Sequence, residues 1–103
     1  MERIDQLKEF LAATPGDSFL QHALALEYIK KGDDNDARLL LESVLQKDPG
    51  YVGSYYHLGK LLERAGDYAF AILTYNKGML ESKKAGDKHA YSELQGALEE
   101  ITE

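Results

Sequence analysis

Apolar residues recur at every third or fourth position through most of this chain, which is the spacing of one face of an α-helix. Segments with this spacing are separated by short polar breaks, and they predict helices at 1–13, 18–31, 35–47, 51–65, 68–84 and 88–101. No stretch alternates apolar and polar residues over enough positions to predict a β-strand. The pattern therefore predicts an all-α fold of about six helices.

The inward sides of these helices carry mostly leucine and other large apolar side chains. We expect the following residues to be buried: Ile4, Leu7, Phe10, Leu11, Leu39, Leu40, Leu41, Val44, Leu45, Ala71, Ile72, Tyr75, Met79, Leu80, Tyr91, Leu94, Ala97, Leu98 and Ile101. The segment 18–31 has a wide apolar face, which predicts contact with more than one neighbouring helix.

The breaks between the helices share a chemistry. Glycine tolerates the left-handed backbone at which a helix often ends, and aspartate can accept a hydrogen bond from the first N–H groups of the next helix. Pro15 and Pro49 add two further stops. We expect Asp17 or Ser18 to cap the second helix. The dipeptide Gly-Asp occurs four times, each time between two predicted helices: at 16–17, 32–33, 66–67 and 86–87. In the second of these breaks, Asp33 or Asp34 is expected to cap.

The helices also repeat at an offset of 34 residues. The offset pairs identical residues: Leu24 with Leu58, Gly32 with Gly66, Asp33 with Asp67, Ala37 with Ala71, Leu39 with Leu73, Leu7 with Leu41, and Pro15 with Pro49. Because the helix breaks coincide as well, the pattern predicts a solenoid of antiparallel helix hairpins. A six-helix bundle without repeats is the alternative.

These positions resemble the tetratricopeptide repeat family. The unit 52–85 matches the family pattern at Tyr55, Leu58, Gly59, Gly66, Ala71 and Tyr75, and the unit 18–51 matches it at Leu24, Ala25, Tyr28, Gly32, Ala37 and Pro49. The resemblance implies an α-α superhelix and a non-catalytic protein-interaction module. It implies a single domain over residues 1–103, with these parts: a leading helix at 1–15, repeats at 18–51 and 52–85, and a capping helix at 88–103.

Composition narrows the function further. The net charge is −6, which disfavours binding to nucleic acid through its phosphates. The chain has no cysteine, which excludes disulfides and suits a reducing compartment, so a cytoplasmic location is expected. The first residues do not resemble a signal peptide, and no apolar segment has the length of a membrane span, so no membrane partner is expected.

Catalytic motifs are absent, so neither enzymatic activity nor a cofactor is expected. His22, His57 and His89 lie on three different helices, and a shared metal site is conceivable. Only His89 has a carboxylate four residues on, at Glu93, and one such pair provides too few ligands for a metal. The histidines are therefore expected to face solvent or a partner.

In the family, certain positions of the first helix of each hairpin line an inner groove. The resemblance places these candidate partner-binding residues there: Phe19, His22, Leu26, Ile29, Tyr56, His57, Lys60, Glu63 and Arg64. An apolar strip, an aromatic anchor and nearby cations suit the binding of a peptide or helix from a protein partner. The alternative is that Leu26 and Ile29 pack on the leading helix.

Self-association is a second hypothesis. Two repeats are close to the minimum that buries its own faces, so an end of the solenoid could dock on another copy. Phe70 is an aromatic residue at a position that is usually polar in the family, and it favours a homo-oligomer.

Overall fold

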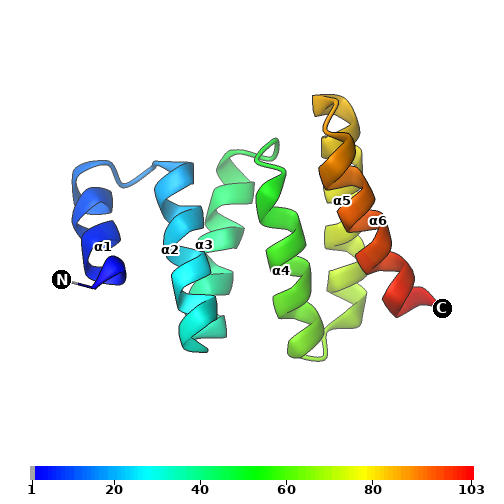
Figure 1. Ribbon diagram of the computed structural model, residues 1–103, viewed down its shortest axis with the longest axis horizontal. Helices are drawn as coiled ribbons and strands as arrows, with labels where there is room; N and C mark the ends of the chain where they lie inside the picture. Colours follow the sequence, from blue (N-terminus) through cyan, green and yellow to red (C-terminus); the bar gives the residue numbers. More distant parts are fainter. Residues whose placement is uncertain (1) are drawn as a thin grey trace. The chain divides into compact units, whose positions relative to one another are not determined.

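The computed structural model describes residues 2–103, and in that range it contains six α-helices and no β-strand (Figure 1). The helices are α1 (Arg3–Ala13), α2 (Ser18–Lys31), α3 (Asp34–Lys47), α4 (Gly53–Arg64), α5 (Tyr68–Ala85) and α6 (Lys88–Thr102). The predicted all-α fold is confirmed, and every predicted break lies between two helices.

The chain divides into two compact units, one ending at Asp48 and the other running from Pro49 to Glu103. In the first, called the N-terminal unit, α2 packs against both α1 and α3. In the second, the C-terminal unit, α5 packs against both α4 and α6, and α4 also contacts α6. Each unit thus contains one complete helix hairpin and one additional helix. The single domain over residues 1–103 stays a prediction.

The two hairpins, α2–α3 and α4–α5, bury equivalent positions of the 34-residue repeat. The core of the N-terminal unit contains Leu7, Leu24, Ala25, Ala37, Leu41 and Val44. The core of the C-terminal unit contains Tyr55, Leu58, Leu61, Leu62, Ala71, Tyr75, Leu94 and Ala97. The repeat read from the sequence is therefore also a repeat of buried positions.

Two buried glycines bring the helices of the C-terminal unit into close contact. A Cβ atom added at Gly59 of α4 would lie 2.1 Å from Cε1 of Tyr75 in α5. A Cβ atom added at Gly78 of α5 would lie 2.6 Å from Cβ of Tyr55 in α4. Each glycine therefore makes room for a tyrosine of the opposite helix, and this fixes how α4 and α5 pack.

Three residues predicted to be buried are exposed instead: Phe10 (58%), Leu39 (66%) and Leu80 (56%). Successive residues of a helix lie about 100° apart, so the run Leu39 to Leu41 cannot be buried on one side, and Leu41 occupies the core. Leu80 likewise points away from the core on α5. In its unit α1 packs against α2, which covers Leu7 but not Phe10.

The caps follow the prediction at three of the four Gly-Asp breaks. The carboxylates accept a backbone hydrogen bond three residues on: Asp17 from Leu20 (2.9 Å), Asp67 from Phe70 (3.4 Å) and Asp87 from Ala90 (3.0 Å). The prediction fails at Asp33, whose side chain makes no capping bond and lies 3.8 Å from Nζ of Lys31. Gly16 also differs from prediction because its φ is not positive, and the C-cap of α1, which ends at Ala13, is Thr14.

Candidate functional site

The four candidate residues of the N-terminal unit lie along one side of α2. Phe19, His22, Leu26 and Ile29 are spaced by three or four residues, so they share a helix face. Phe19 is exposed, and the other three are half-buried. Of the two buried residues of α2, Leu24 points to the opposite side of the helix, whereas Ala25 borders the stripe next to Ile29. The stripe is mostly apolar and partly accessible.

Two of the contacts between α1 and α2 involve Glu27 and Tyr28 of α2, which lie outside the stripe. Nε of Arg3 lies 3.9 Å from the carboxylate of Glu27, and the ammonium of Lys8 lies 5.9 Å from the centroid of the Tyr28 ring. These interactions fix the leading helix beside α2 through polar and cation–π contacts.

The candidate residues of α4 form a network of charges and rings. The ammonium of Lys60 lies 5.6 Å from the centroid of the Tyr56 ring, and the Tyr56 and His57 rings meet edge-on with centroids 5.6 Å apart. The same ammonium lies 3.5 Å from the carboxylate of Glu63 and 3.7 Å from that of Glu100 on α6. Lys60 therefore connects α4 with α6.

Glu63 is held from the opposite helix as well. The hydroxyl of Tyr75, whose side chain is fully buried in α5, donates a hydrogen bond to the Glu63 carboxylate. Burial raises the pKa of Tyr75 far above its ordinary value, and the bond to Glu63 raises it further. Tyr75 thus remains a neutral donor, and the carboxylate of Glu63 is fixed between Tyr75 and Lys60.

The histidine of α4 is placed by burial and by α6. Burial lowers the pKa of His57, and the charge of Glu93 partly opposes this effect. Glu93 also lies 3.7 Å from Nε2 of His89 on its own helix. Within residues 2–103, no three His, Cys, Asp or Glu side chains are grouped so that they could hold a metal ion.

The structure therefore divides the candidate residues into two sets, an apolar stripe on α2 and a polar, aromatic network on α4. Lys60 and Glu63 both interact within the C-terminal unit, and their role in binding a partner stays a prediction. The repeat pattern gave no sign of Glu100 as a partner of Lys60, since that contact depends on how α6 packs. A role for Tyr75 beyond the core could have been suspected from its polar hydroxyl.

The described part of the chain contains no helix that is both long enough and apolar enough to cross a membrane.

Comparison with known proteins identifies the class. No protein-family model matches the chain. A TPR repeat-containing protein of Pseudomonas aeruginosa is 30% identical over 98 residues, which make up 95% of this chain and 93% of the relative. The chain therefore belongs to the tetratricopeptide repeat family.

Solved structures agree with this assignment. A tetratricopeptide repeat domain protein from Salinibacter ruber, known from a crystal structure, is 42% identical, with a TM-score of 0.79 over 82% of this chain and 93% of that one. A protein from Bordetella parapertussis, solved in solution, is 27% identical, with a TM-score of 0.83 over 97% of this chain and 87% of that one. Domains with this fold are generally protein-interaction modules.

Proposed function

We propose that this protein is a non-catalytic adaptor that binds a peptide or helix of a protein partner through the first helices of its hairpins, with the stripe on α2 as one contact surface and the residues of α4 as another. The observation that supports this most directly is the stripe Phe19, His22, Leu26 and Ile29. These side chains keep accessible surface on the side of α2 that faces away from Leu24 of the core. An accessible apolar stripe on a rigid helix suits the docking of an amphipathic segment.

In this proposal α4 contributes polar and aromatic contacts that orient the ligand, whereas α2 contributes apolar contacts. Tyr56 offers an aromatic surface, and Lys60 is held beside it by Glu63 and Glu100. A fixed ammonium next to a ring would orient one polar group of the ligand without the cost of ordering a flexible side chain. His57 and Arg64 complete the proposed contact surface. We expect α2 to bind apolar residues of a ligand and α4 to bind a polar residue. As part of the same proposal the compartment is the cytoplasm.

Selection of helix-forming peptides from a random library on the wild-type protein, followed by fluorescence anisotropy, tests the proposal. Leu26→Ser and Tyr56→Ala should each weaken binding of the selected peptides by about tenfold, the loss expected when a central interface side chain is truncated. Leu39→Ser is the matched control, because Leu39 is exposed on α3 and lies outside the proposed surface. Unchanged affinity in both test variants, with circular dichroism showing intact helices, would remove α2 and α4 as the binding surface.

A further inference from the structure

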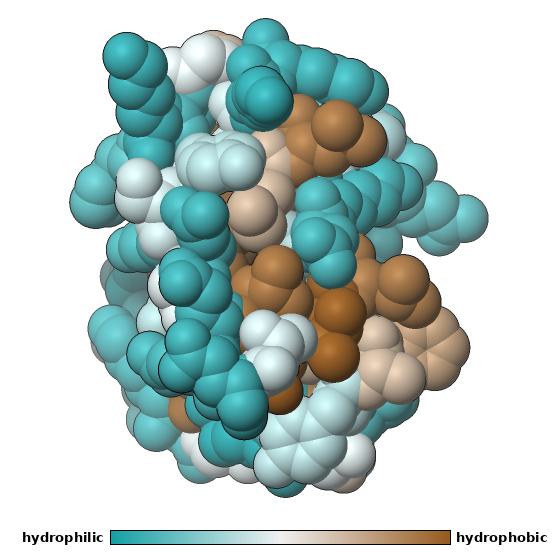
Figure 2. Space-filling model, turned by 90° about the vertical axis from the view of Figure 1, so that its right-hand side faces the viewer, coloured by the Kyte–Doolittle hydropathy of each residue, from teal (hydrophilic) through white to brown (hydrophobic). Residues whose placement is uncertain are grey.

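The outer side of the helix pair α5–α6 carries an apolar surface that the packing of the C-terminal unit does not use. Leu73 and Leu80 of α5 are exposed, and apolar side chains beside them on both helices are half-buried. The half-buried members are Ile72, Met79, Tyr91, Leu98 and Ile101. Figure 2 shows apolar side chains gathered through the middle of the face on which α5 and α6 lie. We call this surface the α5–α6 face.

The N-terminal hairpin carries a smaller apolar surface at the equivalent positions. At the 34-residue offset, Ile72 of α5 corresponds to Arg38 of α3, and Leu80 corresponds to Gln46. Both hairpins bury the equivalent core positions, but Leu73 and Met79 correspond to Leu39 and Leu45, so α3 is polar at only two of these four positions. Ile72 and Leu80 therefore enlarge the apolar surface beyond that of the N-terminal hairpin, and an exposed apolar surface of this kind marks an interaction site.

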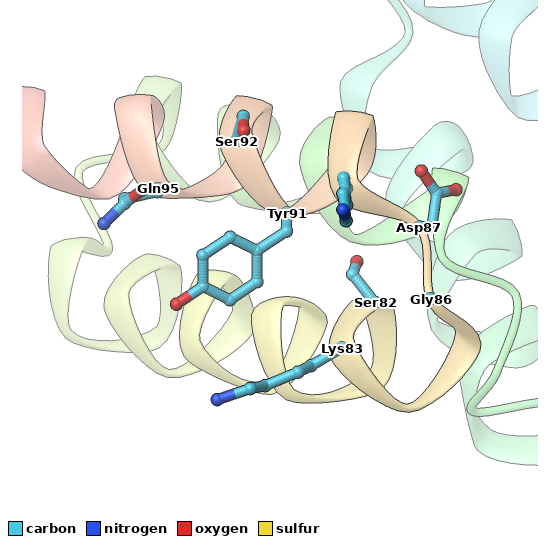
Figure 3. Close-up of a pocket in the computed structure, with 8 residues that line it drawn as sticks. Ser82, Lys83, Gly86, Asp87, Tyr91, Ser92 and Gln95 are labelled. Atoms are coloured by element: carbon cyan, nitrogen blue, oxygen red, sulfur yellow. The ribbon is translucent and has the colours of Figure 1, made fainter.

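The same face is hollowed near the turn between the two helices. A cavity of about 530 Å³ lies between the last turns of α5 and the first turns of α6 (Figure 3). Tyr91 and Gln95 of α6 and Lys83 of α5 line it, and the nearby hydroxyl of Ser82 is buried without a hydrogen-bond partner among residues 2–103. The face thus has a concave part at one end, large enough to receive apolar side chains.

Charges of opposite sign lie at the two ends of the face. Lys83 and Lys88 lie beside the turn between α5 and α6, whereas Glu99 lies near the C-terminal end of α6. None of these three side chains has an ion-pair partner within residues 2–103. Lys88 and Glu99 are eleven residues apart on α6, which is about three helical turns or about 16 Å, so they project from the same side of the helix.

We infer that the α5–α6 face is a dimer interface whose occupant is the same face of a second copy of this chain. A twofold axis through the middle of the face turns it end for end, so that each α6 runs antiparallel to the other. Lys88 of each copy then lies opposite Glu99 of the other, and the apolar residues meet between the two ion pairs. The opposite arrangement, with the two α6 helices parallel, would place like charges together, so the charges fix the orientation.

The proposed dimer interface and the proposed peptide surface lie on different helices. The face lies on α5 and α6, whereas the proposed peptide surface lies on α2 and α4. A dimer formed in this way has two peptide surfaces and gains avidity for a partner with two binding segments. Loss of the dimer and loss of peptide binding are therefore separate experimental outcomes.

Charge reversal provides the test, with sedimentation velocity of the full chain across the micromolar range as the measurement. Wild type should dimerise, and Lys88→Glu and Glu99→Lys should each weaken homodimerisation by about tenfold or more, because each places two like-charge pairs in the interface. An equimolar mixture of the two variants should dimerise again, since both of its ion pairs are attractive. A monomeric wild type, or a mixture no more associated than its components, would overturn the proposal.

A pair of leucine substitutions tests the apolar part. Leu73 and Leu39 occupy equivalent repeat positions, and both are exposed on the surface of the second helix of their hairpin. Leu73→Ser should shift the dimer toward monomer, whereas Leu39→Ser should leave association unchanged, with circular dichroism confirming that both variants are folded. Equal effects of the two substitutions would mean that the α5–α6 face is not the interface.

Discussion

The two hairpins have the same frame but interlock differently. In α2–α3 two of the repeat positions are occupied by Ala25 and Leu41, both fully buried. In α4–α5 the equivalent residues are Gly59 and Tyr75, and the ring fills the space that a Cβ atom at Gly59 would occupy. Glycine is smaller than alanine and tyrosine is larger than leucine. The two helices of each hairpin therefore fill this contact with complementary side-chain volumes.

The exchange has a chemical consequence. A tyrosine in place of Leu41 brings a hydroxyl to the edge of the hairpin, and Glu63, which corresponds to Ile29, accepts its hydrogen bond. At this contact the α2–α3 hairpin has only apolar side chains, and its polar link lies elsewhere, from Lys47 to Gln21 (2.6 Å), whereas α4–α5 has a charged hydrogen bond here. Part of the polar network on α4 therefore depends on a core residue, Tyr75, whose hydroxyl holds Glu63.

The largest expected effect comes from giving the C-terminal hairpin the alanine that the N-terminal hairpin has at the position of Gly59. Gly59→Ala should destabilise the protein by about 3 kcal/mol, because the buried ring of Tyr75 cannot move away while its hydroxyl is bound. Combined with Tyr75→Leu, it reproduces the alanine–leucine pair of the N-terminal unit. The double variant should lose less unfolding free energy than the two single variants lose together, by at least about 1 kcal/mol. Urea unfolding followed by circular dichroism measures the cycle. Additive effects would show that the two residues do not share volume.

An intermediate effect is expected from removing the hydroxyl. Tyr75→Phe should lower the free energy of unfolding by about 1.5 kcal/mol near neutral pH, since Glu63 loses a donor. Because the pKa of Tyr75 is raised in the folded protein, the unfolded chain binds fewer protons above about pH 10, and wild-type stability falls there by up to about 1.4 kcal/mol per pH unit. The difference between wild type and Tyr75→Phe should therefore narrow as the pH rises through this range.

Tyr68→Phe is the control for this titration, because Tyr68 is exposed at the start of α5. It should leave stability near its wild-type value at neutral pH and should preserve the loss at alkaline pH. If Tyr75→Phe showed the same alkaline loss as wild type, Tyr75 would not be the group responsible.

The smallest expected effect concerns Ser82, which corresponds to Asp48 of the N-terminal unit. Its hydroxyl is buried without a partner within residues 2–103, and removing an unsatisfied polar group lowers the cost of burial. Ser82→Ala should therefore raise the free energy of unfolding by about 0.5 kcal/mol, measured by thermal unfolding. A clear loss of stability would mean that the hydroxyl makes a hydrogen bond in solution.

Much of the fold is readable from local sequence rules. The bounds of α2 coincide with the predicted 18–31, because Asp17 caps its start and Gly32 adopts the left-handed backbone at its end. The exposure of Leu39 and Leu80 could not be predicted from the sequence, because both lie in segments with apolar residues on several sides of the helix. Whether a side chain is covered depends on which helices pack against its own, and that is a property of the tertiary structure.

The candidate site was readable only in part. Periodicity and the family resemblance located the stripe on α2 and the residues of α4. They did not reveal that Lys60 reaches Glu100, or that Tyr75 holds Glu63, since these contacts join residues of different helices. The side-chain interactions of this helical repeat therefore depend on contacts between helices, whereas the helix bounds depend on local sequence.

The enrichment of tyrosine in one half of the chain gives the molecule a built-in optical label. The chain has seven tyrosines and no tryptophan, and Tyr28 is the single tyrosine before Pro49. Ultraviolet fluorescence consequently reports almost entirely on the C-terminal unit, whereas far-ultraviolet dichroism reports on all six helices. Coincident unfolding curves from the two signals would indicate a single cooperative transition, and separated curves would give the energetic coupling between neighbouring repeats without any added dye.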